Sequence, residues 1–134
     1  MKKAILVILL SLICVSAYSE EIMLFKTKRF CMQEKDSNGN WPGFSPWEDS
    51  DLKIVVDLTT DVVTIYSPRK QVYQITDSLG EYTDSDGETT AKLRFVDQDG
   101  DLGDMRLMMR NSGKTEIYID FNNIMWVYEV ELIE

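Results

Sequence analysis

The chain has 134 residues, 44% of them hydrophobic, and carries 23 acidic against 14 basic side chains, a formal net charge of −9. This length suits a single domain with one core. So negative a surface repels nucleic acid and anionic lipid, and we expect neither as a partner.

The N-terminus has the parts of a secretory signal peptide. Lys2 and Lys3 precede an apolar run over residues 4–13, and small residues follow. The run is too short to cross a membrane, which takes about 20 residues. We therefore predict a signal peptide over 1–19, a mature domain over 20–134, and export to the periplasm or the medium. No later segment is long and apolar enough to span a membrane.

The two cysteines raise separate questions. Cys14 suggests a lipoprotein, but Ile13 stands where lipid-attachment sites usually have a small residue, which argues against lipid anchoring. Cys31 would be the only cysteine left after cleavage, so no intramolecular disulfide can form. We expect Cys31 to be buried and inert, and an intermolecular pair is the alternative.

The first part of the mature chain has weak patterning. Residues 22–33 can form a strand, and 34–50 form a long loop rich in Asn, Gly, Pro, Ser and Asp. This loop holds Trp41, Phe44 and Trp47 within seven residues. Exposed aromatic side chains at this density mark a binding surface, so these three are our candidate ligand or partner contacts. The alternative is that they fold inward and plug one end of the fold, which we favour for Trp47.

Period-two alternation dominates from residue 52 onward and predicts a series of short strands. One strand ends where Leu79 and Gly80 break it. Asn122-Asn123 fits a two-residue hairpin turn with positive φ, and residues 111–114 form another hairpin loop. The residues predicted to face inward are bulky: Leu52, Ile54, Val56, Val63, Ile65, Tyr73, Ile75, Leu93, Phe95, Met105, Leu107, Met109, Ile117, Ile119, Phe121, Trp126 and Tyr128.

About eight short strands joined by tight turns imply antiparallel neighbours. Because the hairpins are sequential, an all-β up-and-down barrel is favoured over a Greek-key sandwich. An eight-stranded barrel either fills with side chains or holds one small ligand. The bulky inward faces predict a mostly filled interior, with at most a shallow pocket at one mouth near Trp41 and Phe44.

Catalytic motifs are missing from the sequence. The chain has no His, which removes the commonest general base and metal ligand. No nucleophile elbow or phosphate-binding glycine loop appears, so we expect no enzyme and no cofactor. Carboxylates are abundant, which leaves an acid/base hydrolase as the last alternative.

Two acidic turns resemble each other, 84–87 and 97–101. Clustered carboxylates beside a Gly suit calcium, and Asp97, Asp99, Asp101 and Asp104 are the residues concerned. Their order does not match a helical calcium loop, however, and Asp-Gly is a common hairpin turn. We therefore predict turns at the two ends of one strand and no metal site.

The mature chain resembles a group of small uncharacterised exported proteins of Bacteroidetes. The resemblance rests on the aromatic loop and on the segments 53–57, 65–67, 71–75, 97–101, 118–123 and 126–128. It implies a lipocalin-like or related small barrel and a host with two membranes, and it implies no activity. Gly39-Asn40-Trp41 matches the Gly-x-Trp of lipocalins, whereas their Thr-Asp-Tyr motif is absent.

These observations favour an exported, non-enzymatic binding module. Its ligand would be a small apolar molecule, a carbohydrate or a protein. The alternatives are an inhibitor or immunity-type protein that neutralises a basic partner, and a small-ligand carrier.

Overall fold

The computed structural model describes residues 22–133, and all structural statements below concern these residues. The predicted signal peptide over 1–19 lies outside them. No helix that could cross a membrane is found within this range. The described chain forms strands β1 (Ile22–Glu34), β2 (Glu48–Asp49), β3 (Lys53–Asp57), β4 (Val62–Ile65), β5 (Gln71–Thr83), β6 (Thr89–Asp97), β7 (Leu102–Met109), β8 (Thr115–Asp120) and β9 (Ile124–Leu132).

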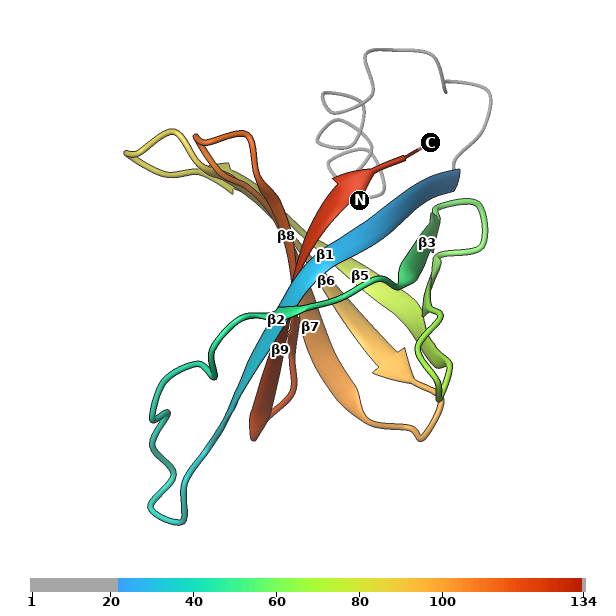
Figure 1. Cartoon of the computed structure of the whole chain (residues 1–134). Coiled ribbons are helices and arrows are strands. Elements are labelled where there is room, and N and C mark those ends of the chain that lie inside the picture. The colour runs from blue at the N-terminus through green and yellow to red at the C-terminus, as the bar shows by residue number, and fades with distance from the viewer. Residues whose placement is uncertain (1–21, 134) are drawn as a thin grey trace.

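The strands close into an eight-stranded antiparallel barrel (Figure 1). From β3 to β9 each strand pairs with the next one along the chain, as predicted for a meander. β1 pairs with β9 along one edge and with β3 along the other, and this closes the sheet. The short β2, which the sequence did not predict, pairs with Arg29 and Phe30 on the edge that β1 shares with β3.

The barrel interior is filled by the side chains that alternate inward. All of the residues predicted to face inward belong to the core or pack against it. β1 adds Met23 and Phe25, which the weak patterning of its sequence did not indicate. Phe25, Ile54 and Phe95 have no solvent exposure at all. The predicted filled interior is therefore confirmed, because bulky side chains from every long strand pack into one core.

Strand β5 is longer than predicted and contains two shifts of pairing register. β5 runs through Leu79 and Gly80, where we expected a break. Its pairing with β6 shifts between Ile75 and Asp77 and again between Ser78 and Glu81, and Gly80 has a φ of +93°. Bulges of this kind absorb extra residues and bend a strand without ending it, and glycine accepts positive φ at little cost.

The two predicted hairpin loops are present. The Arg110 N–H donates to the Lys114 carbonyl at 2.8 Å across one of them. The Phe121 N–H donates to the Ile124 carbonyl at 2.9 Å across the other. This second turn is made without positive φ, because Asp61 is the one non-glycine residue between 22 and 133 that has it.

Candidate functional site

The aromatic loop lies against the side of the barrel. The Ser45 N–H donates to the Met32 carbonyl at 2.7 Å, and the Met32 N–H donates to the Ser45 hydroxyl at 3.0 Å. The Gly43 N–H donates to the Gln33 side chain at 3.1 Å. With β2 just beyond, these bonds hold residues 43–49 along an edge of β1.

Our prediction that Trp47 plugs one end of the fold is therefore wrong. Its side chain is 39% exposed, and its ring lies 4.8 Å from the guanidinium carbon of Arg29. Arg29 pairs with Glu129, on the face of β9 opposite the inward Tyr128. Because β2 fixes the loop beside β1, Trp47 is carried to the outside of the barrel wall.

Phe44 and Trp47 line a hollow on that outer wall, which we call the lateral groove. It has a volume of about 650 Å³. Its floor is Cys31, Tyr118 and Val127, which point outward yet are buried in a second, small apolar cluster. The remaining lining residues come from the loop and from two hairpins: Ser45, Glu88, Arg110, Asn111, Ser112, Lys114 and Glu116.

The three predicted contacts are thus only partly brought together. Phe44, 45% exposed, shares the lateral groove with Trp47. Trp41 lies elsewhere, with the Lys35 ammonium 5.4 Å from its ring, and does not line the groove. Trp41 remains an exposed aromatic side chain, but it is separate from the other two.

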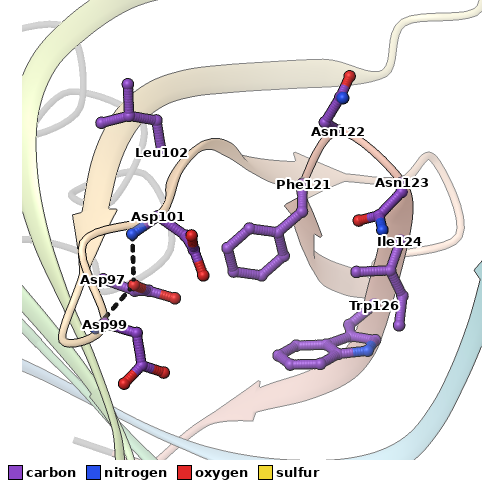
Figure 2. Close-up of a pocket in the computed structure, with 9 residues that line it drawn as sticks. All are labelled: Asp97, Asp99, Asp101, Leu102, Phe121, Asn122, Asn123, Ile124 and Trp126. Carbon is purple, nitrogen blue, oxygen red and sulfur yellow. Dashed lines mark hydrogen bonds between the residues drawn. The ribbon is translucent and has the colours of Figure 1, made fainter.

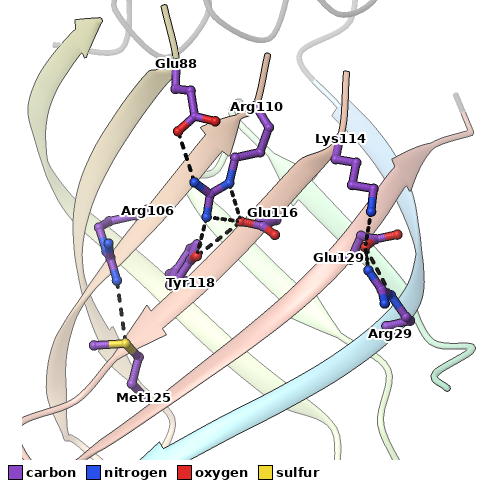
Figure 3. A network of polar contacts seen from close by, with 9 residues as sticks. All are labelled: Arg29, Glu88, Arg106, Arg110, Lys114, Glu116, Tyr118, Met125 and Glu129. Atoms are coloured by element: carbon purple, nitrogen blue, oxygen red, sulfur yellow. Dashed lines mark hydrogen bonds and ion pairs between the residues drawn. The ribbon is translucent and has the colours of Figure 1, made fainter. Parts of the chain in front are cut away.

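A charged network lines part of the lateral groove (Figure 3). Arg110 donates to Glu116 at 2.9 Å, to Glu88 at 3.0 Å and to the Tyr118 hydroxyl at 3.0 Å. The Tyr118 hydroxyl donates to Glu116 at 3.1 Å. Glu116 is only 7% exposed, so its charge needs these partners. The network fixes the positions of the groove's polar side chains.

A second ion pair lies next to this network. Arg29 donates to Glu129 through two nitrogens, and the Lys114 ammonium is 3.8 Å from the same carboxylate. The hydrogen bonds from Arg29 hold the pKa of Glu129 below its ordinary value. Glu129 is therefore ionised at neutral pH, and the long Lys114 side chain remains the more exposed cation at this end of the groove.

Cys31 is buried, as predicted, but it belongs to the outer wall. Its exposure is 2%, and its neighbours are Tyr118 and Val127. Burial raises the pKa of its thiol, which favours the protonated form at neutral pH.

A second hollow, which we call the mouth pocket, opens at one end of the barrel. It has a volume of about 450 Å³ and lies between the β6–β7 turn and the β8–β9 turn. Figure 2 shows Asp97, Asp99 and Asp101 on one side, facing Phe121 and Trp126. The predicted pocket near Trp41 and Phe44 is thus wrong in its position, because that loop lies along the wall instead of crossing a mouth.

The sequence did not single out the charged network as functional. Its signal was present in β8, where the outward Glu116 and Tyr118 alternate with core residues, and in Arg110 just after β7. The groove floor was also visible as Cys31, an apolar residue between the polar outward residues Arg29 and Gln33, and as Val127 beside Glu129. Pattern alone could not show that these positions lie together.

The two hollows offer carboxylates, aromatic rings and hydrogen-bonding side chains. The chain has no His, and no group of three potential metal-binding side chains occurs in the part the structure describes. Asp97 accepts the backbone N–H groups of Asp99 and Asp101, so its carboxylate serves the turn. The chain matches no protein-family model, no curated protein and no solved structure.

Proposed function

We propose that the protein is an exported, non-enzymatic binding module that contacts its ligand or partner with the outside of the barrel wall. The observation that carries this proposal is the lateral groove. Two partly exposed aromatic side chains, Phe44 and Trp47, lie over a buried apolar floor there. Aromatic side chains held in this way dominate the energetics of many binding sites.

The groove suits a ligand with an apolar or ring-shaped body and a polar end. Its volume falls within the range of roughly 300–1,000 Å³ that is usual for small-molecule sites. The rings of Phe44 and Trp47 offer flat apolar surface, and Asn111, Ser112 and Lys114 offer hydrogen-bonding groups beyond the floor. A carbohydrate, a small apolar molecule or the side chains of a protein partner would meet these conditions.

A carrier that holds its ligand inside the barrel has less support. Phe25, Ile65, Phe95 and Ile117 are fully buried, and they belong to one core cluster to which every long strand contributes. Ligand sites in small barrels need an open interior lined with small or polar groups.

The experiment that tests the proposal uses 1-anilinonaphthalene-8-sulfonate, a dye with an apolar ring body and one anionic group. We expect saturable binding that weakens at least tenfold in a Phe44→Ala/Trp47→Ala variant. The matched control is Tyr82→Ala, because Tyr82 is 55% exposed and is not part of the groove. Equal dye binding by the original chain, the double variant and Tyr82→Ala would show that the lateral groove is not the binding site.

A second candidate function is an inhibitor or immunity-type protein that neutralises a basic partner. The observation that favours it is the net charge of −9, combined with three carboxylates at the mouth pocket. Opposite charges on two proteins speed their association and exclude wrong partners.

A further inference from the structure

Two acidic turns at opposite ends of β6 allow an internal comparison. In one, Asp84 accepts the N–H groups of Asp86 and Glu88 at 2.9 and 3.0 Å. In the other, Asp97 accepts those of Asp99 and Asp101 at 2.9 and 2.8 Å. The two turns are alike in backbone hydrogen bonding, so this arrangement by itself indicates a turn and not a ligand site.

The second turn faces an aromatic cavity with three aspartates, whereas the first turn reaches the lateral groove with Glu88 alone, which is paired with Arg110. Phe121 and Trp126 form the far side of the mouth pocket, with their ring centres 5.6 Å apart and their planes at 75° (Figure 2). Phe121 in turn packs on the fully buried Phe95 at 5.4 Å. The aromatic side of the pocket is therefore held in place by the core.

Carboxylates outnumber cations around the mouth pocket. Arg69 donates to both oxygens of Asp99, at 3.1 and 3.0 Å, so the rim already holds one guanidinium of the chain itself. The Asp101 carboxylate has no hydrogen-bond or ion-pair partner among residues 22–133. Arg69 is the one cation beside three carboxylates among the residues that line this pocket and the adjoining hollow of about 240 Å³.

We propose that the mouth pocket binds a cationic side chain, the ammonium of a lysine or the guanidinium of an arginine, presented by a basic partner protein. Aromatic ring faces attract cations, most strongly where water is excluded. Carboxylates add charge-assisted hydrogen bonds in the same small space. The proposal rests on the second candidate function and is independent of the lateral groove, which shares no lining residue with the mouth pocket.

The test is an NMR titration of the purified protein with three probes that are acetylated on the α-nitrogen. They are Nα-acetyl-lysine methylamide and Nα-acetyl-arginine methylamide, which keep their side-chain charge, and the uncharged Nα-acetyl-norleucine methylamide. We expect the two cationic probes to shift the Trp126 indole N–H saturably and the norleucine probe to bind at least tenfold more weakly. Addition of salt should weaken the cationic probes only. A Trp126 signal that does not move, or equal binding of the norleucine probe, would overturn the proposal.

Matched variants then separate the pocket from the turn. Asp101→Asn should weaken the lysine probe at least fivefold, since it removes a carboxylate that has no partner in the described chain. Asp86→Asn, on the equivalent turn at the other end of β6, should leave binding unchanged. An equal effect of the two variants would show that overall charge alone attracts the probe, and the pocket would then be rejected.

The source of the cation is tested with a short peptide and a free amine. A hexapeptide with two lysines should bind more tightly than Nα-acetyl-lysine methylamide, because residues beside the bound lysine can contact the rim of the pocket. Methylammonium binding more tightly than the peptide would contradict a protein partner. None of these results alters the dye experiment on Phe44 and Trp47, so the two proposals fail separately.

Discussion

Gly103 in β7 lies where the structure leaves no room for a side chain. A Cβ atom there would stand 2.6 Å from the backbone oxygen of Asp120 and 2.6 Å from the Cζ atom of Phe95. The oxygen belongs to the adjacent strand β8, and Phe95 is enclosed between Tyr73 and Phe121 at 4.8 and 5.4 Å. Neither neighbour can retreat without disturbing the sheet or the core.

Gly103→Ala should therefore destabilise the barrel, although it adds a single methyl group. Overpacking of a filled core typically costs about 1–3 kcal/mol, and we expect the upper half of that range because backbone is one of the two obstacles. For a domain of this size the melting temperature changes by roughly 4 °C per kcal/mol, so a fall of about 8–12 °C is expected.

Urea unfolding followed by tryptophan fluorescence gives the free energy of unfolding directly. The transition midpoint should fall while the slope with denaturant stays constant. Gly113→Ala is the comparison, because its Cβ would meet no atom within 4 Å and only its φ of +86° opposes a side chain. That strain should cost about 1–2 kcal/mol.

A double-mutant cycle identifies the steric cause. In a Phe95→Leu background the ring atoms are gone, so Gly103→Ala should cost less than in the original chain, while the clash with the Asp120 oxygen remains. A Gly103→Ala protein as stable as the original, or an equal cost in both backgrounds, would refute this account of the packing.

Four further outcomes are expected. Trp126→Ala should cost about 3 kcal/mol, the lower end of the range for buried aromatic residues, since Trp126 is partly buried against the core and Phe121; an unchanged melting temperature would contradict this. Cys31 should react slowly with a thiol reagent in the native protein and rapidly in denaturant, and fast native labelling would show that the floor of the lateral groove is open. The pKa of Glu129 lies below its ordinary 4.5, so its ion pair with Arg29 stabilises the fold above that pH and is lost as the pH falls through the lowered pKa. The difference in unfolding free energy between the original chain and Arg29→Met should therefore shrink on acidification. Millimolar calcium should raise the melting temperature no more than magnesium does, because Asp97 already serves its own turn.

The alternation of inward and outward residues explains why the barrel could be predicted. In β7 and β9, Met105, Leu107, Trp126 and Tyr128 occupy every second position, and a period of two has one structural interpretation when one face is buried. The turns that follow could also be predicted, because their residues are local signals.

The lateral groove could not be predicted in this way. It depends on hydrogen bonds between Ser45 and Met32 that fix the aromatic loop beside β1, and no local pattern specifies such a contact between a loop and a distant face. The prediction that a strand ends at Leu79 and Gly80 failed for a related reason. A glycine in a strand signals either an end or a bulge, and only the pairing partner decides between them.

The closure of the barrel by β1 and β9 joins the first and the last strand of the described chain. Arg29 and Glu129, which are hydrogen-bonded across this seam, are 100 residues apart in sequence. Contacts of such long range slow folding, because the entropy of closing the loop is lost before the contacts form. Until the seam forms, both strands expose unpaired backbone edges, and each can pair with its counterpart in another molecule. Exchange of β1 or β9 between two copies is therefore the form of misassembly that this topology favours most.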